Sequence, residues 1–472
     1  MIKVSCKEEK LRYNAYHLVK AFFPGEEALS EFAPEQEASV RIEFSENIIE
    51  ISAKERREID RELYEKLSRL SGRSLPWGTL LGVRPTKLAS MNLDISREAF
   101  EEKMRSERLV SREKALLAYD IAVKEKGMIQ KALARGEYSL YVGIPFCPSI
   151  CSYCSFSSGA ISAWKNSVEP YLEALCREVE EVSRELSGLK PVTVYIGGGT
   201  PTSLSAEQLD GLLSCITRNF DMGNLLEFTL EAGRPDSISE EKLRVMKDFG
   251  VTRISINPQS MQQKTLDAIG RRHSVGQVYE AFELARKAGF DNINMDMILA
   301  LPGEGLDDVK DTLRQIRSLG PESLTVHSLA VKRDSDLNRN KTLYKPAEPL
   351  LAEKMAEAAS EAAHEMGMEP YYLYRQKGIS GNLENTGCSL PGRECFYNVL
   401  IMEEVSGIIA CGAGAKSKVR LKEAIPDPGR AGKSTFILHS SNPKAIDEYI
   451  RRKGKISKTL KDAIDKAFKN VI

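Results

Sequence analysis

The sequence of 472 residues has no long apolar run and no excess of one charge. No stretch approaches the roughly 20 apolar residues that a membrane-spanning helix needs, so we expect no membrane span. Lys and Arg together number 67, as do Asp and Glu, which gives a formal net charge of zero. Because nucleic-acid-binding proteins are normally basic overall or on one face, nothing here indicates a nucleic-acid partner.

The sequence shows no internal repeat and no low-complexity tract, and we expect no secretory leader. Residues 1–17 (MIKVSCKEEKLRYNAYH) carry charges where a leader would have its apolar core. Cysteine is scarce: of nine cysteines, three lie within eight positions and the others are scattered. This usage suits a reducing compartment in which thiols bind metals rather than form disulfides. We therefore expect a cytoplasmic protein.

The length allows two or three domains with buried cores, and the pattern predicts three. Residues 1–135 begin with an amphipathic helix over 8–23. Two alternating segments, 39–45 and 47–53, then read as a β-hairpin, and further helices follow. This part is predicted to be a small α+β domain.

Residues 136–367 alternate between short strands and helices. Helical patterns separate the strands, and a last helix over 349–367 closes the series. This alternation predicts βαβ units around a parallel sheet, a barrel or partial barrel whose site lies where the strands end. The predicted strands are 139–144, 192–197, 227–232, 252–257, 292–298 and 323–329.

Residues 368–472 lose this periodicity and predict a third, smaller domain. They are rich in aromatic and turn residues at first, then contain a strand-like segment at 406–419 and a basic helical tail at 442–470. The predicted fold class is therefore α/β: a six-stranded partial (β/α)6 barrel with an N-terminal α+β domain and a small C-terminal domain.

Cys147, Cys151 and Cys154 form a C-x-x-x-C-x-x-C motif after the first barrel strand. Thiolates at these spacings can surround one face of a [4Fe–4S] cluster. A structural zinc ion needs four ligands, so three local ligands leave one iron open to an exchangeable group. The alternatives are inert buried cysteines, or a zinc site with a distant fourth ligand. Cys176 is the nearest candidate for that ligand, although it lies within a predicted helix.

A glycine run, YIGGGTPTSLS at 195–205, follows the second strand directly. Consecutive glycines let the backbone approach a ligand closely because no Cβ intervenes. A tight turn into the next helix is the alternative. The run lacks the G-x-G-x-x-G spacing of a dinucleotide site.

Together, these motifs and Tyr153 before the last cysteine resemble the radical S-adenosylmethionine (SAM) enzymes. The ordered segments YVGIPFC, GGGTPTSL, TLEAGRPDSI, TRISINPQSM and NMDMILALPGE are similar to the oxygen-independent coproporphyrinogen III oxidase (dehydrogenase) family. LGVRPTK and YYLYRQKGISGNLENTG resemble its HemZ-like subgroup. The resemblance runs through all three predicted parts.

This resemblance implies two cofactors, a [4Fe–4S] cluster on the three cysteines and SAM. It implies that Tyr141 and Glu231 have catalytic roles, that Tyr153 packs against adenine and that Glu231 holds the ammonium group of SAM. Arg271 is suited to grip a carboxylate. The matching cofactor-binding positions are Tyr141, Tyr153, Gly198, Gly199, Thr200, Glu231, Gln259, Arg271 and Asp296.

Some of these residues also allow a structural interpretation. Glu231 could cap a helix, Arg271 could be solvated, and Asp296 could accept a hydrogen bond from a backbone amide. Their occurrence along successive barrel strands favours the cofactor site.

The resemblance also implies reductive chemistry in tetrapyrrole synthesis. In this family, the cluster reduces SAM to methionine and a 5′-deoxyadenosyl radical, which abstracts hydrogen from a propionate of coproporphyrinogen III. Loss of CO₂ leaves a vinyl group, and a second round gives protoporphyrinogen IX. The implied partners are this tetrapyrrole or haem, and an electron donor such as flavodoxin or ferredoxin. Candidate cations for the substrate carboxylates are Lys332, Arg333 and Arg375.

The sequence departs from the family pattern in three ways. Gly143 stands where the family has a histidine, a proposed proton donor. Ser155 and Phe156 follow Cys154, whereas the well-studied enzymes have a cysteine two residues on. The N-terminal part is also larger than in those enzymes. Because haem-delivery relatives share the C-x-F form, a haem-binding protein or a haem-modifying radical enzyme is an alternative.

The remaining cysteines and histidines carry weaker signals. Cys388, Cys395 and Cys411 could hold a second metal, but small core residues are the more common case. Cys6, Cys176 and Cys215 read as structural. Of the five histidines, His273 and His327 lie nearest the predicted site. His327, at the end of the sixth strand, is the better candidate for a substrate or haem contact.

We expect the Cys151→Ala substitution to abolish both the visible absorbance of the cluster and the cleavage of SAM, because it removes one of only three local ligands. Absorbance and 5′-deoxyadenosine formation are measured after anaerobic reconstitution with iron and sulfide. Retained SAM cleavage in this variant would contradict the cluster assignment.

Overall fold

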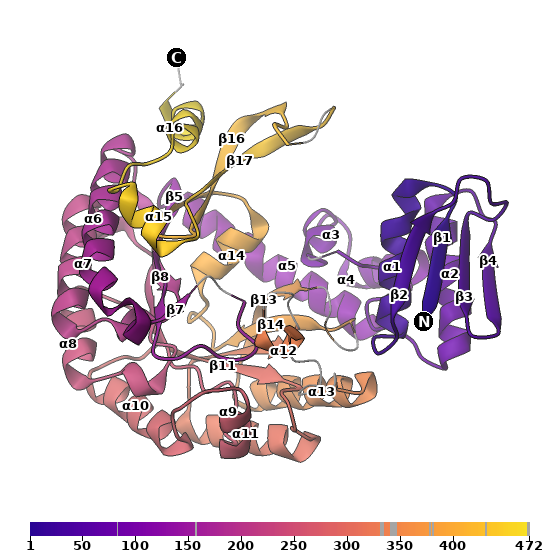
Figure 1. The fold of residues 1–472 in the computed structure, drawn as a ribbon, viewed down its shortest axis with the longest axis horizontal. Helices are drawn as coiled ribbons and strands as arrows, with labels where there is room; N and C mark the ends of the chain where they lie inside the picture. The colour runs from indigo at the N-terminus through magenta and orange to yellow at the C-terminus, as the bar shows by residue number, and fades with distance from the viewer. Residues whose placement is uncertain are drawn as a thin grey trace.

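The computed structural model describes residues 1–82, 84–155, 158–330, 335–339, 347–376, 379, 382–429 and 432–469. It contains an N-terminal four-stranded sheet and an eleven-stranded sheet that runs through the rest of the molecule (Figure 1). Among the helices in these ranges, none is both long and apolar enough to cross a membrane.

The N-terminal unit packs two helices against one face of its sheet. Alternate side chains of its strands form the core: Ile2 and Val4 of β1 and Ile42 of β3 are buried against the helices. The predicted helix and hairpin are present, but two strands beside them were missed. Its elements are β1 (Ile2–Cys6), α1 (Glu9–Phe22), β2 (Ala28–Phe32), β3 (Val40–Phe44), β4 (Asn47–Ile51) and α2 (Arg56–Ser71), with strand order β2-β1-β3-β4.

Six parallel strands form the barrel wall in sequential order. They are β5 (Tyr138–Ile144), β8 (Pro191–Gly198), β9 (Glu227–Glu231), β10 (Arg253–Ser255), β11 (Ile293–Leu299) and β12 (Ser323–Ser328). All six correspond to predicted strands, although β10 ends earlier than its predicted segment. The cysteine loop adds a short parallel pair, β6 (Phe146–Cys147) and β7 (Gly159–Ala160).

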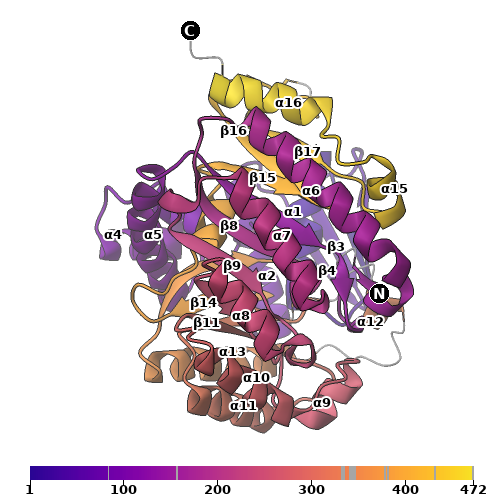
Figure 2. The ribbon, with the colours of Figure 1, turned by 90° about the vertical axis from the view of Figure 1, so that its left-hand side faces the viewer.

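Helices cover the outer side of this wall (Figures 1 and 2). Short β-strands joined by crossover helices produce this arrangement because a right-handed crossover returns each strand parallel to the last. The outer helices are α6 (Val168–Glu185), α7 (Ala206–Asn219), α8 (Glu240–Asp248), α10 (Val275–Lys287), α11 (Leu306–Leu319) and α13 (Pro349–Glu365). Two short helices, α9 (Gln263–Ala268) and α12 (Asp336–Arg339), lie in the loops.

The barrel strands divide their side chains between two environments, since successive residues of a strand point to opposite faces. One set packs under the helices, as Leu140, Val194, Leu230 and Met295 do in the main hydrophobic core. The alternate set lines a cavity on the inner side: Tyr141, Gly143, Tyr195, Glu231, Arg253, Ser255, Asn294, Asp296, Thr325 and His327.

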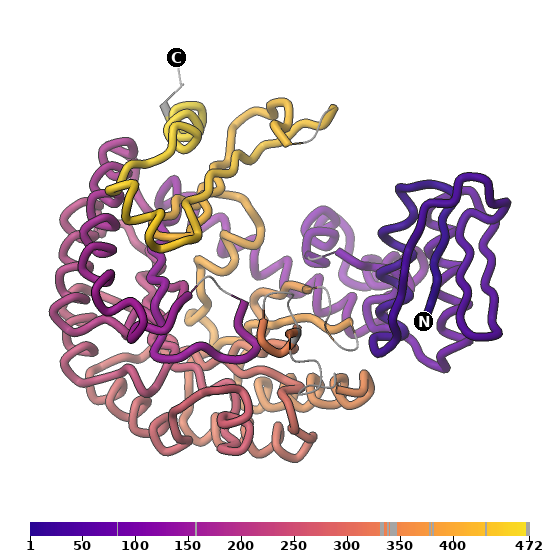
Figure 3. The backbone as a smooth tube through the Cα atoms, viewed as in Figure 1, coloured from indigo at the N-terminus to yellow at the C-terminus, as the bar shows by residue number. Residues whose placement is uncertain are grey.

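The barrel is open, as predicted, because β5 pairs with β15 rather than with β12. Figure 3 shows the resulting gap in the ring of the backbone. Strands of residues 368–472 extend both edges of the same sheet. They are β13 (Glu369–Arg375) and β14 (Glu384–Ser389) beside β12, and β15 (Gly407–Cys411), β16 (Lys416–Pro426) and β17 (Ser434–Ser441) beside β5.

The N-terminal part is anchored to β13 and β14. Trp77 Nε1 donates to Glu384 Oε2 at 2.8 Å, and Leu373 belongs to the same hydrophobic cluster as Trp77. Arg375 donates to the carbonyl oxygens of Leu80 and Asn382. Arg375 thus joins two parts of the chain, which corrects the hypothesis that it meets substrate carboxylates. The connecting helices are α3 (Thr86–Ser90), α4 (Arg97–Arg108) and α5 (Arg112–Leu133).

The C-terminal helices are held to the barrel through one buried carboxyl group. Glu178 of α6 accepts hydrogen bonds from the backbone N–H of Gly412 at 2.8 Å, from Asn442 Nδ2 at 2.7 Å and from the Tyr449 hydroxyl. These donors come from the loop after β15, from the segment after β17 and from helix α15. The helices of this region are α14 (Phe396–Glu403), α15 (Ile446–Arg451) and α16 (Lys458–Ile464).

We expect Glu178→Ala to lower the free energy of unfolding by about 3 kcal/mol, because it leaves three donors without their acceptor. Urea denaturation followed by circular dichroism measures this loss. The exposed neighbour variant Glu180→Ala is the control and should change stability by less than about 0.5 kcal/mol. Equal losses in the two variants would contradict the role given to Glu178.

Candidate active site

A cavity of about 1030 Å³ opens on the inner side of the barrel wall. It receives the carboxyl ends of the parallel strands, where ligands of such folds bind. The twelve residues that the sequence assigned to the cluster and to SAM binding all line this one cavity. They are Tyr141, Cys147, Cys151, Tyr153, Cys154, Gly198, Gly199, Thr200, Glu231, Gln259, Arg271 and Asp296. Their individual roles stay predictions.

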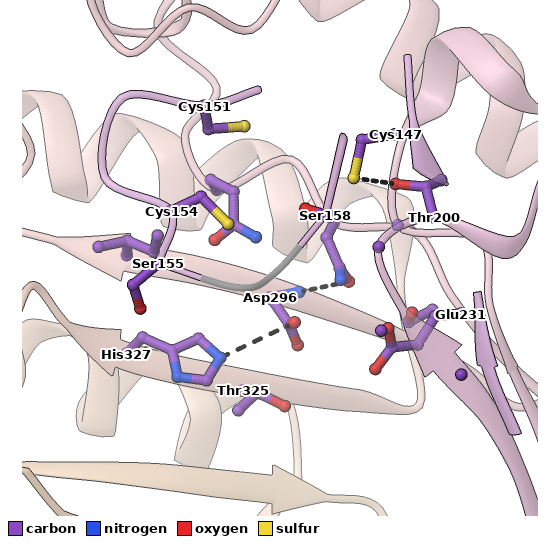
Figure 4. A pocket seen from close by; sticks show the side chains of 18 of the residues that line it. Cys147, Cys151, Cys154, Ser155, Ser158, Thr200, Glu231, Asp296, Thr325 and His327 are labelled. Atoms are coloured by element: carbon purple, nitrogen blue, oxygen red, sulfur yellow. Dashed lines mark hydrogen bonds and ion pairs between the residues drawn. The ribbon is translucent and has the colours of Figure 1, made fainter. Parts of the chain in front are cut away.

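The three cysteines of the motif surround one end of the cavity. Figure 4 shows their sulfur atoms facing a common space. Thr200 Oγ1 donates to Cys147 Sγ at 3.6 Å, and Arg234 Nη1 donates to Cys151 Sγ at 3.9 Å. Burial raises the pKa of the Cys147 thiol, while hydrogen bonds from Thr200 and Ser158 oppose that shift. Such donors stabilise a thiolate that binds iron.

The donor set fits a [4Fe–4S] cluster. Within the described ranges, no three His, Cys, Asp or Glu side chains lie close enough together to hold a single metal ion. A four-iron cluster makes a different demand, because each thiolate binds a different iron and the ligands stand apart. Cys147, Cys151 and Cys154 supply three soft ligands around one space, which leaves a fourth iron for another ligand.

The glycine run lies directly against the cysteine loop. The backbone N–H groups of Gly199 and Thr200 donate to the carbonyl oxygens of Ile144 and Phe146, each at 2.7 Å. A Cβ at Gly199 would stand 2.6 Å from the Phe146 carbonyl oxygen, so only glycine fits. A Cβ at Gly197 would stand 2.9 Å from the carboxyl group of Glu231. Glycine therefore leaves room both for the loop contact and for that carboxyl group.

Glu231 is enclosed at the end of β9 and hydrogen-bonded from the neighbouring strand. The hydroxyl of Tyr195 donates to its Oε1 at 2.5 Å. Burial raises the pKa of Glu231 to about 7, the nearby Asp296 adds to the shift, and hydrogen bonds from Tyr195 and Gly198 oppose it. The Tyr195 hydroxyl thus favours the ionised form, which a ligand ammonium group would need.

Gln259 has an unused acceptor facing the cavity. Its side chain is buried, its Oε1 has no hydrogen-bond partner among the described residues, and its backbone has a φ of 66°. The strained backbone is held by β11, because Gln259 N donates to the Asp296 carbonyl oxygen at 3.0 Å and Ile298 N donates to Gln259 O at 2.9 Å. A buried acceptor without a donor, at a strained position, indicates a ligand site.

Arg271 lies in the loop after α9 and is buried. Its Nη1 donates to the Asn257 carbonyl oxygen, and its Nη2 donates to the Tyr153 hydroxyl at 3.4 Å. Its Nε has no hydrogen-bond partner within the described ranges. Part of the guanidinium is therefore already engaged by protein groups, so a two-point grip on a ligand carboxylate would need these bonds to change.

Asp296 lies within β11, where it meets the sixth strand (Figure 4). Its Oδ2 is 3.8 Å from His327 Nε2, and Asn294 Nδ2 donates to its Oδ1 at 2.6 Å. Burial alone would raise the pKa of Asp296, but His327, Asn294 and Thr325 together hold it below its usual value. His327 also meets the Tyr374 hydroxyl at 3.3 Å through its Nδ1.

His273, the other candidate histidine, lies outside the cavity lining and is fully buried. Neither of its ring nitrogens has a hydrogen-bond partner in the described part of the chain, and burial lowers the pKa of His273 to about 4. The structure therefore favours His327 over His273 as a ligand contact.

Sequence reasoning missed several residues that line the site. Arg234 is buried, pairs with Asp236 at 3.0 Å and reaches Cys151. Tyr195 and Tyr397 stack with ring centroids 4.4 Å apart. Arg234 lies in the quoted segment TLEAGRPDSI, but no pattern indicated its partner. Tyr195 could have been identified from the sequence, because it shares a strand face with Gly197 of the glycine run. Tyr397 could not, because it comes from the distant helix α14.

The other cysteines lie outside the cavity lining. Cys388, Cys395 and Cys411 are all buried, and the Cys395 thiol donates to Glu227 Oε1 at 3.2 Å. Cys215 lies next to Cys176 and donates to its carbonyl oxygen at 3.8 Å. These positions support the structural interpretation. Phe156, Lys332 and Arg333 lie outside the described residues.

Comparison with known proteins agrees with the site. A family model described as the Radical SAM superfamily matches residues 141–316. Oxygen-independent coproporphyrinogen-III oxidase-like protein HemZ of Bacillus subtilis (strain 168) is 43% identical over 384 residues, which are 80% of this chain and 75% of that protein. The chain belongs to this radical SAM family. A [4Fe–4S] cluster and SAM, the cofactors of the superfamily, are therefore its cofactors, as predicted.

One further relative and one solved structure are also similar to this chain. Heme chaperone HemW of Lactococcus lactis subsp. lactis (strain IL1403) is 34% identical over 293 residues, 61% of this chain and 72% of that protein. The solved structure of coproporphyrinogen III oxidase (HemN) from Escherichia coli, a radical SAM enzyme, matches with a TM-score of 0.54 at 20% identity, covering 69% of this chain and 72% of that chain. The second similarity confirms the predicted fold.

We expect Tyr195→Phe to raise the pKa of Glu231 by about one unit, because the stabilising hydroxyl is lost while the ring stays. If Glu231 holds the ammonium group, SAM binding at pH 7 should weaken roughly five-fold and recover near pH 9. Calorimetry on the reconstituted protein across pH measures this.

Tyr279→Phe is the matched control, since the Tyr279 hydroxyl donates to Gln315 outside the cavity. An unchanged pH profile in Tyr195→Phe would exclude the positioning role of Tyr195.

Proposed function

We propose that this protein decarboxylates coproporphyrinogen III to protoporphyrinogen IX without oxygen, by radical SAM chemistry. The main support is one continuous cavity that joins the cysteine loop, the Glu231 region and a wall of tyrosines. Its volume of about 1030 Å³ lies at the upper end of the range for small-molecule sites, so a macrocyclic substrate can lie beside the cofactor.

When bound and reduced, the cluster supplies the electron that splits SAM into methionine and a 5′-deoxyadenosyl radical. The protein's own residues bind and orient the cofactor for this step. Glu231 holds the ammonium group, and Gly198, Gly199 and Thr200 let the methionine end lie close to the cysteine loop. Gln259 Oε1, which has no donor among the residues that the structure describes, would accept a hydrogen bond from the cofactor.

The part of the cavity wall that is lined by tyrosines suits a tetrapyrrole. Tyr195, Tyr372, Tyr374 and Tyr397 present aromatic surface to the cavity, and such rings pack well against pyrrole rings. Arg253 is buried at the same cavity, its Nε has no hydrogen-bond partner, and it forms no ion pair with any described residue. A buried guanidinium in this position would attract a propionate carboxylate. The name of the B. subtilis relative points to the same substrate class.

A second candidate function is haem binding without decarboxylation. It is favoured by Gly143, which lines the cavity at the position where a histidine was expected. HemW relatives, named as haem chaperones, support the same alternative. His327 would then be the contact to test, because it lines the cavity with its ring held between Asp296 and Tyr374.

The deciding assay is anaerobic. Reconstituted protein receives dithionite, SAM and coproporphyrinogen III, and mass spectrometry follows the tetrapyrrole. We expect the loss of two CO₂ units together with formation of 5′-deoxyadenosine. The Cys151→Ala variant, which lacks a cluster ligand, is the negative control.

Formation of 5′-deoxyadenosine with an unchanged tetrapyrrole would contradict the decarboxylase. Stable haem binding under those conditions, lost in His327→Ala, would establish the haem-binding alternative.

A further inference from the structure

Helices α6 and α7 lie side by side on the outer face of the barrel, over the neighbouring strands β5 and β8 (Figure 2). Two hydrogen bonds between the helices fix their positions. Gln208 Nε2 donates to Glu169 Oε1 at 2.6 Å near the beginning of both helices. Ser183 Oγ donates to Asn219 Oδ1 at 3.3 Å near the ends of both. The two helices are therefore held together along most of their length.

A pair of cysteines meets between these two contacts, Cys176 of α6 and Cys215 of α7. Cys215 Sγ donates to the Cys176 carbonyl oxygen at 3.8 Å, and the two thiols are also hydrogen-bonded to each other. Both residues lie outside the lining of the active-site cavity. Helix packing thus brings two thiols together at a place that is separate from the three cluster ligands.

The two thiols have different environments. Cys176 is half-buried, whereas Cys215 is buried. The hydrogen bond from Cys215 lowers the pKa of the Cys176 thiol, although burial and the nearby Glu180 oppose the shift and Arg218 adds to it. The same hydrogen bond, together with burial, raises the pKa of the Cys215 thiol. Cys176 therefore ionises first and is the thiol that an external reagent can reach.

This asymmetry is typical of cysteines that react with oxidants. The thiolate is the nucleophile, so a reachable thiol with a lowered pKa attacks first, and a neighbouring thiol can then resolve the product. A disulfide needs its sulfur atoms about 2.05 Å apart. Thiols that already contact each other need only a small movement to reach that distance.

We propose that Cys176 and Cys215 form a reversible disulfide between α6 and α7 when the protein meets an oxidising low-molecular-weight disulfide such as glutathione disulfide. The Cys176 thiolate attacks one sulfur of that reagent, a mixed disulfide forms, and one glutathione leaves as its thiolate. Cys215 then gives its proton to solvent and attacks the Cys176 sulfur, which releases the second glutathione. Two protein thiols are oxidised, and one glutathione disulfide is reduced to two molecules of glutathione.

The disulfide would join the two helices that stand behind the cofactor loops. In α6, the Tyr171 hydroxyl donates to the Gly143 carbonyl oxygen at 2.6 Å, at the end of the strand that leads to the cysteine loop. Helix α7 follows the glycine run. Because a cross-link restricts the unfolded chain, we expect the oxidised protein to unfold at a higher temperature than the reduced protein.

The test treats the reconstituted protein with glutathione disulfide under anaerobic conditions. Free thiols are then blocked with iodoacetamide, and the protein is digested with trypsin without reductant for mass spectrometry. We expect a linked pair of peptides that end at Arg177 and Arg218. The intact protein should lose two hydrogen atoms in mass and regain them with dithiothreitol, while the visible absorbance of the cluster stays unchanged.

Substitutions separate the two steps. Cys215→Ser keeps a donor beside Cys176 but removes the second sulfur, so the protein should stop at the mixed disulfide and gain the mass of one glutathione. Cys176→Ser should not react, because Cys215 is buried and its pKa is raised. The matched control, Cys6→Ser, removes a buried thiol from the N-terminal unit and should form the disulfide as the wild type does.

A wild-type protein that keeps one glutathione on Cys176 and gives no linked peptides would overturn the proposal. So would an absence of any reaction, or a disulfide that joins Cys176 to another cysteine. If a variant does not fold, the peptide map of the wild type still decides. The reaction mixtures contain neither SAM nor a tetrapyrrole, so failure of the proposed decarboxylation leaves their outcome intact.

Discussion

The site depends on one constraint, the alternation of side chains along parallel strands. Each barrel strand buries one set of residues beneath the outer helices, as with Val194 and Leu230, and must present the other set to the interior. This places Tyr195 and Glu231 on the same face of neighbouring strands, with Tyr195 opposite Thr229, so that the side chains of Tyr195 and Glu231 meet diagonally. A register shift of one residue would exchange the apolar and polar sets, so the same packing that stabilises the fold also fixes the geometry of the cavity.

The cavity walls come from segments far apart in the sequence. The strands supply the expected cofactor contacts, whereas Tyr374 and Tyr397 come from the C-terminal segment and pack beside the strand residues His327 and Tyr195. The C-terminal segment also flanks the six barrel strands on both sides, with β14 beside β12 and β15 beside β5. The part of the chain that carries the cofactor motifs therefore does not form the cavity wall alone.

The barrel and its motif residues could be predicted from the sequence because both follow local rules. Strand runs of period two, glycines at a strand end and closely spaced cysteines are each readable within a few residues. Strands β1 and β2 were missed although Pro24 and Gly25 mark a turn before β2; the residues of β2, Ala28–Phe32, include Ala and Glu, which are depleted in strands. The contacts of Arg234 with Cys151 and of Arg375 with Leu80 could not be foreseen, because they join segments whose separation is set only by tertiary packing.

The parallel pairing of β15 with β5 has a consequence for how the protein matures. Val142 pairs with Cys411, so the strand that leads into the cysteine loop lacks its neighbour until nearly the whole chain has been synthesised. Contacts of such large sequence separation form late and slowly in folding. The cysteines at 147, 151 and 154 emerge from the ribosome long before that neighbour exists. The strand that leads into the cysteine loop therefore gains its second neighbour only after residues 407–411 have been synthesised.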